Sequence, residues 1–174
     1  MHRIFAFVGP HRSGKSTLIR EFLKLAPDSR AAEIKSLTTR CRRGPEDDVF
    51  YAFVTRDEFE RHIAAHELVQ WAEYAENYYG NDRKALDEHL EKCAGFLALV
   101  ENGVKNFIAA GYELVIIRVK PEGDLPVQDK RRSAEDVARS TTSIPVDFEI
   151  VNSFAPGGLQ KAVAELATLL IPLL

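Results

Sequence analysis

The chain has 174 residues, a length typical of one compact domain, and its 45% hydrophobic and 28% charged residues can build a sizeable core. Its 23 basic and 26 acidic residues leave a formal net charge of -3, so no bulk positive field attracts nucleic acid or an anionic membrane. Any phosphate-binding site must therefore be local.

Short apolar runs alternate with amphipathic segments along the chain. Strands are expected at residues 4–8, 33–37, 50–54, 68–74, 96–100, 114–119 and 148–151. Helices are expected at residues 16–25, 55–65, 81–93, 104–110 and 159–170. We expect Asn81 or Asp82 to cap the third of these helices and Gly95 to close it. Strands that alternate with helices predict an α/β fold with a parallel sheet.

The two cysteines, Cys41 and Cys93, have no metal-ligand spacing and fit a reducing compartment. No apolar run in the sequence approaches the roughly 20 residues that span a bilayer. We therefore expect a cytoplasmic, soluble protein. The oligomeric state cannot be inferred from the sequence.

Residues 9–16 satisfy the pattern G-x-x-x-x-G-K-[ST] between an expected buried strand and an expected helix. Backbone N–H groups of such a loop surround nucleotide phosphates, while its lysine adds positive charge and its hydroxyl is available to Mg²⁺. We expect ATP and Mg²⁺ to bind here, with Lys15 catalytic and Ser16 as the metal ligand. The nucleotide-binding residues would be Gly9, Pro10, His11, Arg12, Ser13, Gly14, Lys15, Ser16 and Thr17.

Three further segments carry distinctive motifs. Residues 36–46 read SLTTRCRRGPE, residues 51–54 read YAFV, and residues 78–80 read YYG after Trp71. These segments resemble those of guanylate kinases, a family with an S-x-T-T-R-x-x-R-x-G-E segment, a Y-x-F-V strand and a Y-Y-G turn, and FEIVN at 148–152 resembles a later strand of the same family. The resemblance implies a single P-loop NTPase-type domain, a parallel sheet flanked by helices with a small acceptor-binding flap and a short lid. The core would be 1–35, 92–120 and 145–174, the flap about 36–91 and the lid about 121–142.

The resemblance also implies how an acceptor phosphate would be held. Arg40, Arg43, Tyr51 and Tyr79 would bind the monophosphate, because arginine forks match phosphate oxygens and tyrosine hydroxyls complete the shell. Arg42 is expected to be solvated.

In the family, arginines of the lid close over the transferred group. The candidates for this catalytic role are Arg131, Arg132 and Arg139, together with Arg43 of the flap. The alternative is that the three lid arginines form a solvated face.

The base pocket departs from the family. Ser36 is kept, but Gln70 and Asn81 stand where guanylate kinases have a glutamate and a Ser or Thr. A carboxylate accepts from two guanine N–H groups, whereas an amide accepts one and also donates. Guanine should therefore be recognised less well in an unchanged pose, and an edge such as that of adenine or uracil could fit instead.

The family's D-x-D pair is also missing. Ala98 and Val100 stand in its place, which leaves Glu101 either to serve Mg²⁺ or the acceptor, or to be only a strand-end carboxylate. We predict a nucleoside monophosphate kinase with GMP as its acceptor. The alternatives are a sugar-phosphate kinase similar to ribose 1,5-bisphosphate phosphokinases and a non-catalytic guanylate-kinase-like binding module.

Overall fold

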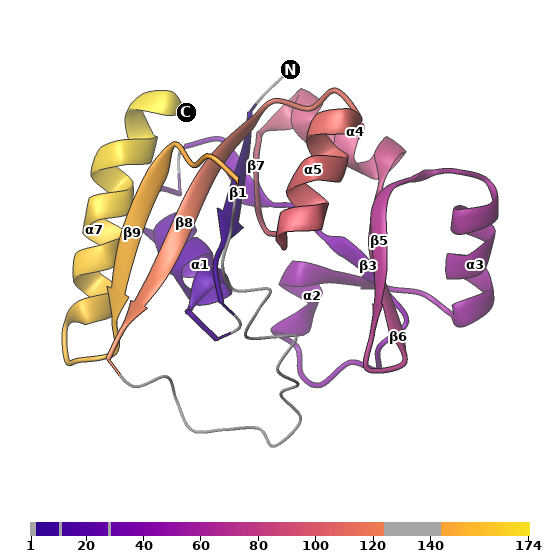
Figure 1. Ribbon diagram of the computed structural model, residues 1–174, viewed down its shortest axis with the longest axis horizontal. Helices are drawn as coiled ribbons and strands as arrows, with labels where there is room; N and C mark the ends of the chain where they lie inside the picture. The colour runs from indigo at the N-terminus through magenta and orange to yellow at the C-terminus, as the bar shows by residue number, and fades with distance from the viewer. Residues whose placement is uncertain (1–2, 11, 28, 124–143) are drawn as a thin grey trace.

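A five-stranded parallel sheet forms the centre of the protein (Figure 1). The computed structural model describes residues 3–10, 12–27, 29–123 and 144–174. The strand order is β2-β7-β1-β8-β9, and every neighbouring pair is parallel. The strands are β1 (Ile4–Val8), β2 (Ala31–Glu33), β7 (Ala94–Ala98), β8 (Leu114–Glu122) and β9 (Phe148–Ser153).

Helices cover both faces of this sheet, so the side chains of β1 are buried on both sides. Phe5 and Phe7 point to one face, where Phe22 of α1 (Lys15–Leu25) and Leu166 of α7 (Gly158–Leu170) join the same core cluster. The alternate residues of β1 join a second cluster with α4 (Arg83–Lys92) and α5 (Glu101–Ala109). A short 3-10 helix, η1 (Ile171–Leu173), follows α7. No helix in the described part of the chain has the length and apolar character needed to cross a membrane.

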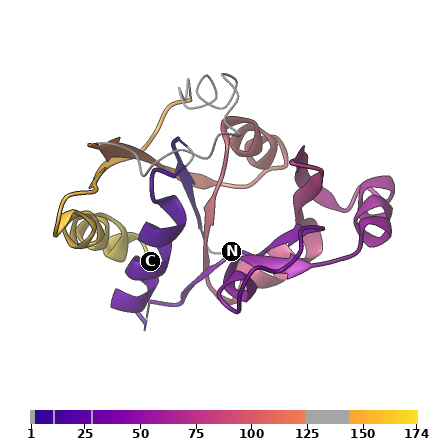
Figure 2. The same ribbon diagram turned by 90° about the horizontal axis from the view of Figure 1, so that it is seen from below.

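A second, four-stranded sheet has the order β4-β3-β6-β5. Its strands are β3 (Ser36–Thr38), β4 (Tyr51–Phe53), β5 (Leu68–Tyr74) and β6 (Asn77–Asp82). Two helices accompany it, α2 (Asp47–Phe50) and α3 (Arg56–Ala64), and a capping box between Thr55 and Glu58 starts α3 as the sequence pattern suggests. Figures 1 and 2 show this sheet and α3 on the side of the molecule opposite α7.

The α/β fold class is confirmed, but several predicted elements are wrong in detail. The strand expected at 33–37 is two strands in different sheets, because the chain leaves the central sheet after Glu33 and enters the second sheet at Ser36. The Tyr78-Tyr79-Gly80 segment lies within β6 instead of forming a turn. Gly95 does not close α4, because that helix ends at Lys92 and Gly95 already pairs with Ile4 in the central sheet.

The strand expected at 114–119 is also longer than expected, because β8 continues to Glu122. A proline is tolerated there since β1 pairs with β8 only as far as Arg118, so Pro121 has a strand neighbour on one side alone. In the loop expected at 38–48, α2 begins at Asp47.

Candidate active site

The loop between β1 and α1 is shaped by two glycines with positive φ. Gly9 has φ +146° and Gly14 has φ +90°, conformations that L side chains rarely adopt. A Cβ at Gly9 would meet the carbonyl oxygen of Val119, and one at Gly14 would meet the amide of Asn152. Both glycines are therefore required for the close packing of this loop against β8 and β9.

Asn152 holds the loop from the end of β9. Its Nδ2 donates to the carbonyl oxygen of Ser13 at 2.9 Å, and both residues are buried. The sequence alone does not identify Asn152 as a site residue. The available signal was a polar side chain near the end of a buried strand, at the edge of the sheet where the loop lies.

Lys15 folds back over the loop. Its Nζ donates to the carbonyl oxygens of Gly9 at 2.9 Å and Pro10 at 2.6 Å. Burial lowers the pKa of this amine to about 8. The positive charge is thus held over the loop by two backbone carbonyls, at the N-terminus of α1 where the first N–H groups have no intrahelical partner.

Ser16 is exposed in the first turn of α1, so its hydroxyl is accessible to a ligand. Thr17 is half-buried and lines a cavity of about 220 Å³ between α1, the end of β9 and the start of α7. Ser13 is fully buried and Arg12 is exposed, while His11 lies outside the described residues. The cavity is lined by Gly14, Thr17, Asn152, Ser153, Phe154, Ala155, Leu159 and Gln160.

Of the four residues expected at the acceptor phosphate, three are in contact. Arg40 is buried, and its guanidinium carbon lies 4.9 Å from the centre of the Tyr51 ring. The Tyr51 ring meets Tyr79 edge to face at 6.0 Å, and burial raises the pKa of the Tyr51 hydroxyl. Arg43 is exposed, and its backbone N–H donates to Asp47.

Asp47 is a second residue whose place in the site is not evident from the sequence alone. Its Oδ2 accepts from Arg40 Nη1 at 3.0 Å and from the backbone N–H of Arg43 at 2.8 Å. Hydrogen bonding to Arg40 holds the pKa of the Asp47 carboxyl below its usual range. The available signal was the acidic run at 46–48 beside the arginines. Arg42, expected to be solvated, is exposed and pairs with Asp48 at 2.8 Å.

The three residues expected in the base pocket form one hydrogen-bonded chain. Gln70 Nε2 donates to Asn81 Oδ1 at 2.8 Å, and Asn81 Nδ2 donates to Ser36 Oγ at 3.1 Å. Asn81 is buried, and these two partners satisfy hydrogen bonds of both its amide oxygen and its amide nitrogen. With both contacts made, Gln70 still has an acceptor oxygen and Ser36 a hydroxyl hydrogen.

The family model of guanylate kinase matches residues 1–149 of the chain. The chain belongs to the guanylate kinase family. A guanylate kinase from Synechocystis sp. is 33% identical over 92% of this chain and 91% of its own length. One from Mycoplasma pneumoniae is 31% identical over 77% of this chain, and the match spans 58% of that protein's length. The crystal structure of guanylate kinase from Anaplasma phagocytophilum superposes with a TM-score of 0.69 at 23% identity, covering 97% of this chain and 84% of that one, and so shares its fold.

Ala98 and Val100, which stand in place of the family's D-x-D pair, lie at the end of β7 and in the loop that follows it. Val100 is 61% exposed just before α5, and Glu101 opens that helix with an ion pair to Lys105 at 2.7 Å. Glu101 therefore lies near the carboxyl end of β7, already paired with a lysine one turn along. Arg131, Arg132 and Arg139, the expected lid arginines, lie outside the described residues.

Proposed function

We propose that this protein transfers the γ-phosphoryl group of ATP to a nucleoside monophosphate, GMP, yielding ADP and GDP. The observation that carries the proposal is the buried Arg40 stacked on Tyr51, a cationic phosphate subsite in a chain that also keeps an intact phosphate loop. The relatives are guanylate kinases by name, which favours this reaction over the sugar-phosphate alternative.

The phosphate loop would bind the donor. Lys15 would leave the carbonyl oxygens of Gly9 and Pro10 for the donor phosphates, where a charged partner replaces neutral ones. The exposed hydroxyl of Ser16 fits a magnesium ligand, because Mg²⁺ prefers oxygen donors and retains several waters. When bound, Mg²⁺ would neutralise charge on the donor phosphates.

The acceptor would be aligned by charge and hydrogen bonding. Arg40 and Arg43, with Tyr51 and Tyr79, would hold the acceptor phosphate so that one of its oxygens faces the donor. No strong general base is needed, since a phosphate oxygen is already a nucleophile and catalysis rests on alignment. Arg131, Arg132 and Arg139 are proposed to bring further positive charge, and Glu101 is proposed to lie beside the acceptor.

The base pocket supports guanine through one acceptor and one donor. The oxygen of Gln70 would accept from guanine N1–H, while the Ser36 hydroxyl would donate to an acceptor on the base. The guanine N2 amine would lack the carboxylate partner that the family supplies. This is the reason to expect weaker discrimination against AMP than a glutamate at position 70 would give.

The decisive experiment is ADP release from Mg-ATP with single acceptors. GMP, dGMP, AMP, UMP, CMP and ribose 1,5-bisphosphate would be offered separately to the purified protein, with Lys15→Ala as the background. Turnover highest with GMP supports the proposal. Turnover only with ribose 1,5-bisphosphate, or normal turnover by Lys15→Ala, would refute it.

A further inference from the structure

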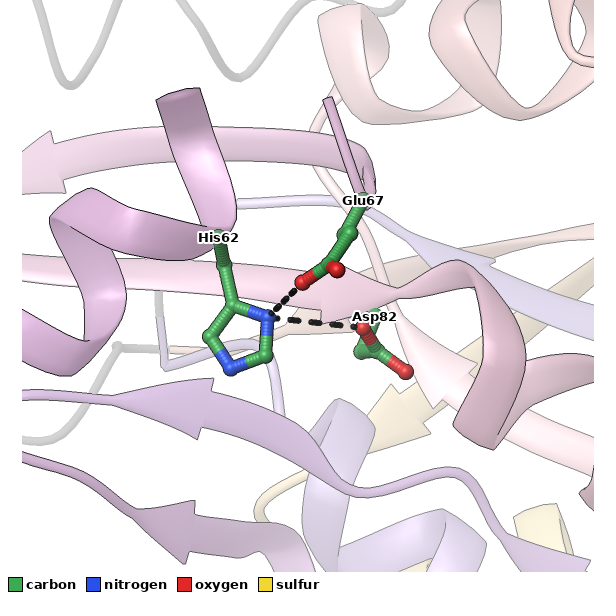
Figure 3. A group of neighbouring side chains, drawn as sticks. All are labelled: His62, Glu67 and Asp82. Carbon is green, nitrogen blue, oxygen red and sulfur yellow. Dashed lines mark hydrogen bonds and ion pairs between the residues drawn. The ribbon is translucent and has the colours of Figure 1, made fainter. Parts of the chain in front are cut away.

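Three side chains with metal-binding atoms converge at the edge of the second sheet (Figure 3). They are His62 in the last turn of α3, Glu67 just before β5, and Asp82 at the end of β6. His62 Nδ1 lies 2.6 Å from Glu67 Oε2 and 3.7 Å from Asp82 Oδ2. One nitrogen and two carboxylate oxygens thus lie within 4.8 Å of one another, and the proposed reaction uses none of them.

Backbone hydrogen bonds hold the three segments together. The N–H of Glu67 donates to the carbonyl oxygen of His62 at 3.1 Å, and the N–H of Arg83 donates to that of Glu67 at 2.9 Å. Asp82 Oδ1 caps α4 by accepting from the N–H of Ala85 at 2.7 Å. This cap orients the carboxylate so that its other oxygen faces His62, which is the role that outer-shell contacts play around metal ligands.

We propose that His62, Glu67 and Asp82 bind one Zn²⁺ ion, with water completing a tetrahedral site. Zinc bonds of about 2.0–2.1 Å place neighbouring ligand atoms about 3.3 Å apart, and the two separations at His62 Nδ1 bracket that value. Two carboxylates beside a neutral imidazole offer two negative charges to a divalent ion. The nitrogen ligand favours Zn²⁺ over Mg²⁺, which takes oxygen donors.

Zinc binding would replace a hydrogen bond. In the metal-free protein the neutral imidazole can carry its hydrogen on Nδ1 and donate it to Glu67, whereas with the ion bound to Nδ1 the hydrogen would lie on Nε2, so the ring changes tautomer and releases no net proton. His62 and Glu67 are 32% and 53% exposed, so zinc can reach the site from solvent without unfolding of the chain. The ion would connect α3 to the open end of the β5–β6 pair, where Leu68 is paired with Asp82.

The test is a calorimetric titration of the chelator-treated full chain with Zn²⁺ in excess Mg²⁺. We expect one zinc per chain and a higher Tm in zinc. His62→Gln should weaken binding by about 100-fold, and Glu67→Gln and Asp82→Asn by at least about tenfold. Asparagine is also a favoured N-cap residue, so Asp82→Asn should leave α4 folded. Weaker zinc binding by this variant can therefore be attributed to the lost carboxylate and not to unfolding of the helix.

His66→Gln is the matched control, because His66 is exposed in the turn that follows α3 and lies outside the cluster of His62, Glu67 and Asp82. It should bind zinc like the wild-type protein and show the same rise in Tm. X-ray absorption of the loaded protein should show nitrogen and oxygen neighbours only. Sulfur scattering near about 2.3 Å would place the ion on a cysteine and overturn the proposal, as would unchanged affinity in His62→Gln or no binding by the wild type.

Discussion

Asp47 and Arg40 form an ion pair at 3.0 Å, with their side chains only 14% and 9% exposed. The pair stands where an acceptor phosphate is proposed to bind, and the same Asp47 oxygen also accepts from the backbone N–H of Arg43. A carboxylate of the chain therefore occupies the donors that the phosphate would use. Acceptor binding must replace this internal counter-ion or share Arg40 with it.

Replacing Asp47 with asparagine tests this competition. Asp47→Asn should lower the free energy of unfolding by about 1–2 kcal/mol, because Arg40 loses a charged partner at a site that is largely shielded from solvent. The rise in Tm on adding GMP should be larger than in the wild type, since the phosphate no longer competes with a carboxylate. Thermal unfolding with and without GMP measures both effects. Asp48→Asn is the matched control, because the Asp48 side chain is 47% exposed and pairs with Arg42 instead of Arg40. A smaller GMP shift in Asp47→Asn would mean that Asp47 positions Arg40 for binding.

Lys15 should make nucleotide affinity depend on pH. Its pKa is lowered to about 8 by burial, and a bound triphosphate favours the charged amine, so binding above that pH takes up a proton. Affinity for ATP should therefore fall as the pH rises from 7 to 9. Calorimetry across this range should show the decline in the wild type and a flat, weak profile in Lys15→Met. Lys24→Met, at an exposed position of the same helix, should retain the wild-type profile. An equal slope in Lys15→Met would assign the titration to another group.

Gln70→Glu should shift base preference toward guanine. A carboxylate at position 70 can accept from both guanine N1–H and N2–H, and the Asn81 amide can turn to donate to it while its oxygen accepts from the Ser36 hydroxyl. The ratio of kcat/KM for GMP to that for AMP should rise by about tenfold or more, or roughly 1.4 kcal/mol. Asn106→Asp, which adds a carboxylate at an exposed position of α5, should leave the ratio unchanged. A ratio that does not move in Gln70→Glu would show that position 70 does not contact the base.

Glu33 should make stability fall with rising pH. Its Oε2 is buried without a hydrogen-bond partner, and burial raises the pKa of the carboxyl to about 8. The folded state therefore binds a proton that the unfolded chain releases near its ordinary pKa. The free energy of unfolding should decrease between about pH 4.5 and pH 8.

Glu33→Gln removes the titrating carboxyl group, and with it the cost of a buried negative charge. The variant should be more stable than the wild type at pH 8 by about 1–3 kcal/mol. Denaturant unfolding at pH 5 and pH 8 measures the difference, and Glu91→Gln on the exposed side of α4 is the control. If the two pH values give the same difference between Glu33→Gln and the wild type, the carboxyl is ionised in the folded protein.

Short-range patterns in the sequence were sufficient for the family, the fold class and most elements. The phosphate loop can be recognised because it is local: nine consecutive residues, from the end of a buried strand into the first turn of a helix, carry every feature that the chemistry needs. The capping box at Thr55 and the Asp82 cap are local in the same sense. The roles of the acceptor residues and lid arginines remain predictions, which the kinase assays and variants above address.

Tertiary structure decided what depends on residues far apart in the chain. Asn152 and Ser13 are separated by 139 positions in the chain, and Asn81 and Ser36 by 45 positions. Neither hydrogen bond can therefore be predicted from a local pattern in the sequence. The division of the expected strand at 33–37 between two sheets has the same cause, since hydrophobic pattern predicts a strand but not its neighbours. The burial that lowers the pKa of Lys15 also arises only when separate elements pack together. Local sequence patterns therefore indicate which chemistry the chain carries, whereas packing between distant segments sets how those groups are charged, paired and oriented.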